Sequence, residues 1–271
     1  FLDTHRFGQV DMVQAPRSPG STLKPFLYGF ALEAGLIHSA SLLVDAPQLF
    51  GDYRPENFGS GYYGPVSATA ALQQSLNIPA VDLLERLKPE VFTARLQQGG
   101  LSLTLPDYAR PNLAIILGGA ATSLEALVSA YTAFARQGLT GKLRFTNPEP
   151  LSQRRLFSEG AAWIVREMLV SHARPDLPSD LLAISTSRQL AWKTGTSYGF
   201  RDAWALGVTD QYTVGVWVGR PDGTPMPGHY GAITAAPILF NIVDGLPPTA
   251  TWTTSRPRPE NVARLDICWP T

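Results

Sequence analysis

The sequence has little cysteine and no excess of charge of either sign. Cys268 is the only cysteine, so a disulfide within the chain and a zinc site made of several cysteines are both excluded. Acidic and basic residues balance at 22 each, which leaves no net charge to draw the chain toward nucleic acid or an anionic membrane surface. We therefore expect no nucleic-acid partner.

A signal peptide, long apolar runs and histidine clusters are also missing. No apolar stretch is long enough to span a bilayer, so we expect the chain to be soluble as given. It begins at Phe1 without an initiator methionine, which suggests a piece cut from a longer protein. The histidines occur singly, at His5, His38, His172 and His229, and we expect neither a metal site nor a cofactor.

Apolar residues are plentiful, and their pattern changes along the chain. Hydrophobic residues make up 44% of the 271 positions, enough to bury a large core. Helix-like patterns come first. They predict helices over residues 22–34, 66–74, 80–87, 123–137 and 158–170, with Ser21 capping the first. Residues 45–64, rich in Gly, Pro, Asn and aromatics, predict an ordered loop.

Strand-like patterns come late in the chain. Residues 190–196, 202–209 and 212–219 are rich in β-branched and aromatic side chains, and the short turn at residues 210–211 predicts antiparallel pairing of the last two. Residues 247–271 are rich in proline and predict a linker toward a following domain. We expect one domain over residues 1–246, lacking its N-terminal part, followed by that linker.

The first motif that suggests chemistry is Ser21-x-x-Lys24, which follows a Pro-Gly corner. A serine hydroxyl is a poor nucleophile and needs a base within hydrogen-bond reach. Positions i and i+3 share a helix face, and a buried lysine amine next to another cation can be neutral enough to take the serine proton. A capping serine beside a surface lysine explains the same pair, which occurs about once by chance in a chain of this length.

Two further motifs carry polar side chains at element ends. Ser75-Leu76-Asn77 lies at a break between two predicted helices, where the side chains can face a cleft or make local backbone hydrogen bonds. Lys193-Thr194-Gly195-Thr196 ends a predicted strand; it could bind a carboxylate through the lysine and the hydroxyls, or form an ordinary edge strand. Each motif alone is weak, but the three occur once each, and two of the four lysines of the chain occupy motif positions.

Together these motifs resemble those of the active-site serine penicillin-recognising enzymes. The stretches YRPENF, VSATAALQQSLNIPAV, LGGAATSLEALVSAYTAFARQG and KTGTSYGFRDAWALG are similar to the transpeptidase domain of class A bifunctional penicillin-binding proteins, over residues 6–246. The middle motif reads Ser-Leu-Asn where related β-lactamases carry Ser-Asp-Asn. The Glu-x-x-x-Asn pattern of their deacylating glutamate does not occur, so we expect no rapid β-lactam hydrolysis.

The resemblance implies an α/β fold of the α+β type, in which an antiparallel sheet flanked by helices and an all-helical lobe enclose the active site in a cleft. It also implies that Ser21 attacks the D-Ala-D-Ala bond of a peptidoglycan stem peptide, forms an acyl-enzyme and passes the acyl group to an acceptor amine. Lys24 would be the acylation base. Ser75 would relay a proton to the leaving amine, and Lys193 would polarise the Ser75 hydroxyl.

Binding roles are implied for the remaining motif residues. Asn77 would hold the substrate amide, Thr194 and Thr196 would contact the carboxylate of the donor or of a β-lactam, and Gly195 would allow close approach. The backbone N–H groups of Ser21 and Thr196 would form the oxyanion hole. The implied partners are peptidoglycan stem peptides and β-lactam antibiotics.

The resemblance also implies a location, and it leaves two other functions open. The family carries an N-terminal membrane anchor and a glycosyltransferase domain, so the full-length protein would lie on the extracytoplasmic face of the inner membrane, with membrane contact only through the missing part. A D,D-carboxypeptidase would use the same residues with water as the acceptor. A non-catalytic sensor of β-lactams or peptidoglycan would be acylated without turnover.

Overall fold

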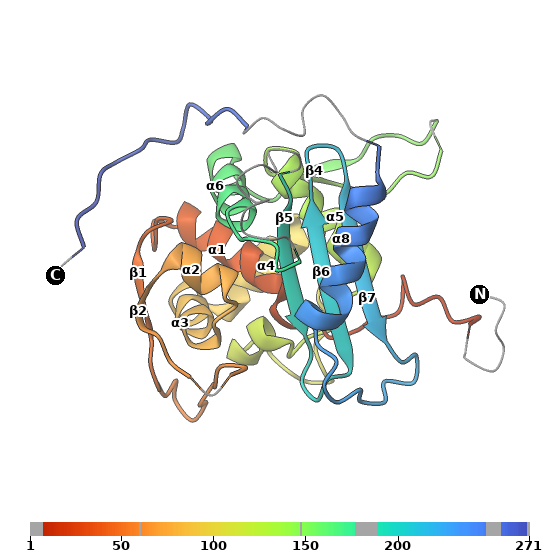
Figure 1. Cartoon of the computed structure of the whole chain (residues 1–271), viewed down its shortest axis with the longest axis horizontal. Coiled ribbons are helices and arrows are strands. Elements are labelled where there is room, and N and C mark those ends of the chain that lie inside the picture. The colour runs from red at the N-terminus through yellow and green to blue at the C-terminus, as the bar shows by residue number, and fades with distance from the viewer. Residues whose placement is uncertain (1–7, 60, 147, 177–188, 248–255, 270–271) are drawn as a thin grey trace.

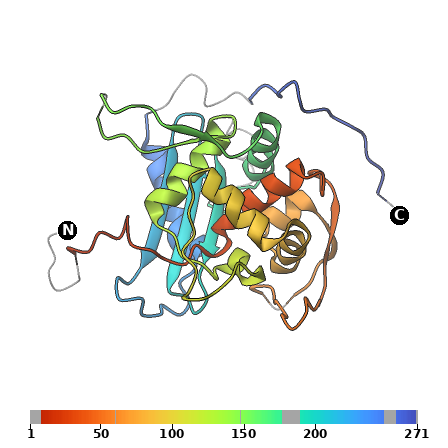
Figure 2. The same cartoon turned by 180° about the vertical axis from the view of Figure 1, so that it is seen from behind.

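The computed structural model describes residues 8–59, 61–146, 148–176, 189–247 and 256–269. A three-stranded sheet lies beside a lobe of helices (Figure 1), and its strands are β5 (Ala191–Thr196), β6 (Asp202–Val208) and β7 (Thr213–Gly219) in that order. Helix α8 (Ala236–Gly245) covers one face of the sheet. Helix α5 (Leu124–Ala135) covers the other, as the view from behind shows (Figure 2).

The helical lobe faces the β5 side of the sheet. Its elements are η2 (Gly20–Leu23), α1 (Lys24–Glu33), α2 (Ala68–Gln73), α3 (Asn77–Leu87), α4 (Pro89–Gln98), η3 (Leu113–Leu117) and α6 (Glu159–Val170). The short turn η4 (Gly231–Ala235) contacts the sheet and α8 instead. Two small antiparallel hairpins complete the set, β1 (Leu42–Asp45) with β2 (Gly64–Ser67) and β3 (Leu139–Gly141) with β4 (Gln153–Arg155).

The sheet separates two apolar cores because its side chains alternate between its faces. Trp192 of β5 and Ala205 of β6 pack with α8, whereas Ala191 of β5 and Trp204 of β6 belong to the larger core shared with the helical lobe. Lys193 lies two residues after Ala191. The alternation therefore directs Lys193 to the face that meets the helical lobe.

Helix α1 runs through the middle of the larger core. Eight of its ten residues are buried, and Phe26 packs against Tyr131 and Phe134 of α5. The Tyr131 hydroxyl donates a 2.6 Å hydrogen bond to the carbonyl of Thr22, which fixes η2 to α5. The turn that carries Ser21 is thereby anchored on the scaffold rather than on a loop.

Most of the predicted elements are confirmed. The three late strands, their antiparallel pairing and the turn at residues 210–211 are present. The predicted fold class, an antiparallel sheet flanked by helices with a helical lobe, is confirmed. Ser123 and Ser158 cap α5 and α6 by accepting hydrogen bonds from backbone N–H groups three residues on.

The predicted helix starts are wrong in three places. Ser21 caps nothing, because residues 20–23 form a 3-10 turn that begins after Pro19, and α1 starts only at Lys24. Residues 66–67 pair with β1 as a strand, which delays α2 to Ala68. Helix α3 starts at Asn77 rather than at residue 80, since Pro79 lies in its first turn, where a missing N–H costs nothing.

Residues 256–269 of the predicted linker form no helix or strand, and they run from above α6 along the outer side of the helical lobe (Figure 1). Arg256 donates to Asp210 at 2.7 Å and to the carbonyl of Ala135, at the end of α5. Asp210 also accepts from Arg166, whose side chain is fully buried. Residues 248–255 and 270–271 lie outside the described residues, and the boundary at residue 246 and the linker stay predictions.

Asp210→Asn is expected to lower the free energy of unfolding by about 3 kcal/mol, because the buried guanidinium of Arg166 then keeps only the longer 3.5 Å ion pair with Glu167, and Arg256 loses the carboxylate to which it donates. Urea denaturation of the two proteins measures the difference. Asp107→Asn, the same substitution at an exposed position, serves as the control and should change stability by less than about 0.5 kcal/mol. Equal midpoints for Asp210→Asn and Asp107→Asn would contradict the role of Asp210.

Candidate active site

Strand β5 lies unusually close to the turn η2, and two glycines make this approach possible. A Cβ on Gly20 would lie 2.4 Å from the carbonyl oxygen of Thr196, and Gly20 also has a positive φ of +52°. A Cβ on Gly195 would lie 2.5 Å from the carbonyl oxygen of Pro19. Neither position can hold a larger residue without moving the strand away from Ser21.

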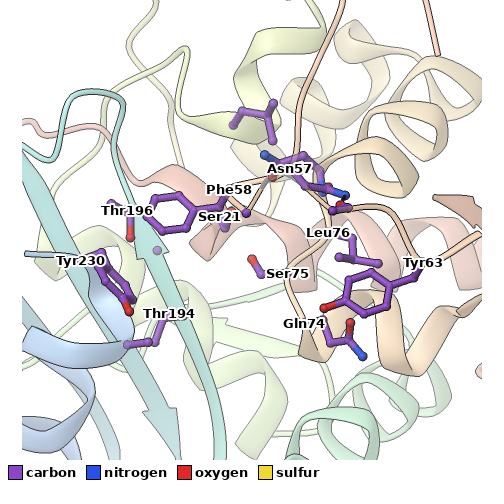
Figure 3. A pocket seen from close by; sticks show the side chains of 16 residues that line it. Ser21, Asn57, Phe58, Tyr63, Gln74, Ser75, Leu76, Thr194, Thr196 and Tyr230 are labelled. Atoms are coloured by element: carbon purple, nitrogen blue, oxygen red, sulfur yellow. Dashed lines mark hydrogen bonds between the residues drawn. The ribbon is translucent and has the colours of Figure 1, made fainter. Parts of the chain in front are cut away.

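Ser21 is the second residue of η2 and lines a cavity of about 420 Å³. The first backbone hydrogen bond of the turn runs from the N–H of Thr22 to the carbonyl of Pro19, so the N–H of Ser21 precedes it and has no partner within the turn. The Ser21 side chain is half-buried and faces the cavity together with Ser75 and Thr196 (Figure 3).

Lys24 opens α1 and is fully buried. Its amine donates three hydrogen bonds to the turn that begins α3: to the carbonyl of Ser75 at 2.6 Å, to the carbonyl of Leu76 at 3.0 Å and to Oδ1 of Asn77 at 2.7 Å. No hydrogen bond joins this amine to Ser21 Oγ within the part of the chain that the structure describes. The prediction that Lys24 takes the Ser21 proton therefore stays untested.

Ser75 lies between the two lysines of the motifs. Its φ of +60° places it in the left-handed region, which turns the chain sharply between α2 and α3. Its Oγ accepts a 2.7 Å hydrogen bond from the Lys193 amine, while its carbonyl accepts from Lys24. The Lys193 amine also donates to the carbonyl of Thr194 at 2.8 Å. The three motifs thus meet at one residue.

Burial makes both lysines weaker bases than usual. It lowers the pKa of Lys24 well below its ordinary value; the nearby Lys193 cation lowers it further, and the Asp45 carboxylate opposes both effects. Burial lowers the pKa of Lys193 to about 7. An amine whose pKa is lowered in this way can accept a proton near neutral pH and release it again.

The third motif presents main-chain groups as well as side chains to the cavity. The N–H of Ser197 donates to the carbonyl of Asp202 on β6, and hydrogen-bonding direction alternates along an antiparallel ladder. The N–H of Thr196 therefore points away from β6, toward η2, where a Cβ on Gly20 would lie 2.9 Å from its nitrogen. Oγ1 of Thr196 accepts from the N–H of Gly231, and Thr194 lines the same cavity.

Several residues of the cavity wall were not predicted from the sequence. Asn57, Phe58 and Tyr63 come from the predicted loop 45–64, and Tyr230 precedes η4 (Figure 3). The ring of Phe58 lies 5.3 Å from that of Tyr230 and so joins the helical side of the cavity to the sheet side. The density of Gly, Pro, Asn and aromatic residues in that loop was the available signal, but it does not say which side chains turn inward.

Comparison with known proteins identifies the family. The family model described as "Penicillin binding protein transpeptidase domain" matches residues 7–244, and the chain belongs to this family. Penicillin-binding protein 1C of Escherichia coli is 53% identical over 99% of the chain and 34% of its own length, which confirms the expected likeness to class A proteins of this kind.

Solved structures share the fold. The chain matches PonA1 of Mycobacterium tuberculosis in complex with penicillin V with a TM-score of 0.73 at 22% identity, over 94% of this chain and 74% of that one. It matches penicillin-binding protein A of M. tuberculosis, a ceftriaxone acyl-enzyme complex, with a TM-score of 0.70 at 22% identity, over 86% and 61%. The chain spans about a third of the length of the curated E. coli relative. No helix of the described residues is long and apolar enough to cross a membrane.

The amine of Lys193 is expected to titrate near pH 7, because burial disfavours its charged form. Carbon NMR of protein labelled at the lysine side chains measures this, and the spectrum is simple because the chain has four lysines. The Lys193→Arg variant identifies the resonance by its loss. A Lys193 resonance that titrates only near the ordinary value of about 10 would contradict the expected burial effect.

Proposed function

We propose that this chain is a serine-type D-Ala-D-Ala transpeptidase that cross-links peptidoglycan stem peptides and is acylated by β-lactams. The observation that carries the proposal is that Ser21 and Ser75 line one cavity while the buried amines of Lys24 and Lys193 both hydrogen-bond to Ser75, in a chain of this family. The complex of the related PonA1 with penicillin V and the ceftriaxone acyl-enzyme of penicillin-binding protein A support the same chemistry.

Acylation would begin at Ser21. Its Oγ attacks the carbonyl carbon between the two terminal D-alanines while the neutral amine of Lys24 takes the hydroxyl proton. A neutral Lys24 amine has two protons for three acceptors, so one of its present hydrogen bonds is released and its lone pair becomes available. The N–H groups of Ser21 and Thr196 would stabilise the oxyanion, where one donor is typically worth about 3 kcal/mol.

Collapse of the intermediate breaks the bond between the carbonyl carbon and the nitrogen of the terminal D-alanine. Ser75 Oγ gives its proton to that nitrogen, and Lys193, which donates to Ser75 Oγ, replaces it. Free D-alanine leaves, and the rest of the peptide stays on Ser21 as an ester. An acceptor amine then attacks the ester and loses a proton to the same lysine pair, which regenerates Ser21 and forms the cross-link.

The remaining motif residues would bind the donor. Asn77 holds a substrate amide at the helical side of the cavity, and Thr194 and Thr196 contact the terminal carboxylate on the sheet side. Gly195 keeps β5 close enough to η2 for its edge to face the substrate. A β-lactam acylates Ser21 by the same attack, with ring opening in place of loss of D-alanine.

We also propose the context of this unit. Residues 1–246 form the transpeptidase domain, and residues 247–271 lead toward a following domain. The full-length protein acts at the extracytoplasmic face of the bacterial inner membrane, where its substrate lies. It reaches the membrane only through a part that this chain does not contain.

A labelled penicillin is expected to add covalently to Ser21, and the Ser21→Ala variant should show no adduct, because the attacking oxygen is gone. Intact-mass and peptide-mapping mass spectrometry measure both. Ser39→Ala, at an exposed serine outside the cavity, is the matched control and should be labelled like the unchanged protein. An adduct at another serine, or none at all, would rule out the proposed chemistry.

A stem peptide ending in D-Ala-D-Ala, incubated with a labelled acceptor amine, is expected to give a cross-linked product that contains the label and to release D-alanine. Chromatography with mass detection separates this product from the hydrolysed peptide. Hydrolysis alone would make the chain a D,D-carboxypeptidase. An acylated protein without either product would make it a sensor.

A further inference from the structure

Asp45, at the end of β1, is a fully buried carboxylate close to the proposed active site, although it belongs to none of the three motifs. Within the described residues no lysine or arginine forms an ion pair with it. It is held by hydrogen bonds instead: Nδ2 of Asn57 donates to both its oxygens, at 2.8 and 3.1 Å, and the N–H of Tyr63 donates at 2.9 Å. A buried charge is costly, so its presence calls for a reason.

Asn57 connects this carboxylate to the second motif. While its amide nitrogen donates to Asp45, its Oδ1 accepts a 2.9 Å hydrogen bond from the N–H of Asn77, at the start of α3. The Asn77 side chain continues the connection, since its Oδ1 accepts from the Lys24 amine at 2.7 Å. An unbroken path of polar contacts therefore runs from Asp45 to Lys24 through two asparagines.

The turn that this path holds, residues 75–77, has a strained backbone. Ser75, two residues before Asn77, has a positive φ, a conformation that residues other than glycine adopt only when their surroundings hold them there. The Asn77 side chain also donates to the carbonyl of Glu56, which gives the loop 45–64 a second hold on the turn. Without Asn57 the N–H of Asn77 would lose its acceptor inside the cavity wall.

The charge of Asp45 has a second use. Lys24 and Lys193 are both buried, both hydrogen-bond to Ser75 and repel each other when protonated. Asp45 is the negative group that acts on Lys24, and Tyr28, one turn further along α1, is neutral because burial and then Asp45 raise its pKa. A neutral asparagine at position 45 could accept hydrogen bonds but would carry no charge to offset that of the Lys24 ammonium group.

We propose that Asp45 is a positioning residue of the active site: through Asn57 it holds the Ser75–Asn77 turn against Lys24, and its negative charge is the counter-ion of the buried Lys24 amine. The inference rests on the proposed function, in which Lys24 is the base that takes the Ser21 proton. It adds Asp45 and Asn57 to that function. Neither residue touches a reacting atom; Asn57 fixes the turn around Lys24, and Asp45 sets the pH range in which Lys24 is neutral.

The acylation rate of Ser21 by a fluorescent penicillin, measured as a function of pH, tests the charge. Acylation needs a neutral Lys24, so the rate rises with pH through the pKa of that amine, and Asp45 raises this pKa. Asp45→Asn is therefore expected to move the rising limb to lower pH by about one unit. Asp52→Asn, the same change at an exposed position of the same loop, should leave the limb in place. An unmoved limb in a folded Asp45→Asn protein overturns the counter-ion role.

Asn57→Ala tests the connection separately, and it keeps the inference testable if Asp45→Asn does not fold. This variant keeps the carboxylate but breaks the path to Asn77, so we expect the plateau rate to fall at least about tenfold with no shift of the limb to lower pH. Wild-type plateau rates in Asn57→Ala overturn the positioning role. Both results leave the proposed function standing as long as the unchanged protein is labelled at Ser21, whereas absence of that label removes the function itself.

Discussion

The site depends on the hydrogen bonds that two buried lysine amines make to one serine, Ser75. Lys24 donates to the Ser75 carbonyl and Lys193 donates to the Ser75 hydroxyl, so Ser75 links the helical lobe to strand β5 at the site. Burial, and after it the neighbouring charge of Lys193, lowers the pKa of Lys24 and suits its amine to abstract a proton. Like charges this close also repel each other. The hydrogen bonds around the two lysines and the Asp45 carboxylate offset that repulsion.

The scaffold brings these groups together by ordinary means. Alternation along β5 turns Lys193 toward the lobe while the main-chain N–H of Thr196 faces η2 at the strand edge. Gly20 and Gly195 let the strand and the turn approach until backbone atoms touch. Tyr131 then ties the turn to α5, so a helix that packs in the same core as α1 supports the position of Ser21.

The features that could be predicted from the sequence are those whose signal lies within a few neighbouring residues. Each motif lies within a few residues, and the late strands show in their composition, so both were predictable. The short hairpins β1–β2 and β3–β4 were not, because strands of three or four residues leave no pattern. Asp45 and Asn57 were missed for a different reason. The partners that connect them are 12 to 20 residues apart in the chain, and only the fold shows that they meet.

The hydrogen bonds that Asp210 accepts from Arg166 and Arg256 affect how the molecule responds to a pull on its C-terminal end. Arg256 fastens the C-terminal segment to the turn between β6 and β7 and to the end of α5, and Trp269 makes a further bond to the carbonyl of Ala40 on the helical lobe. A pulling force applied beyond residue 269 therefore acts first at two separated points, Ala40 and Asp210. Followed back from that end, both contacts come before α8, so the pull reaches the helical lobe, the end of α5 and the β6–β7 turn before it reaches α8.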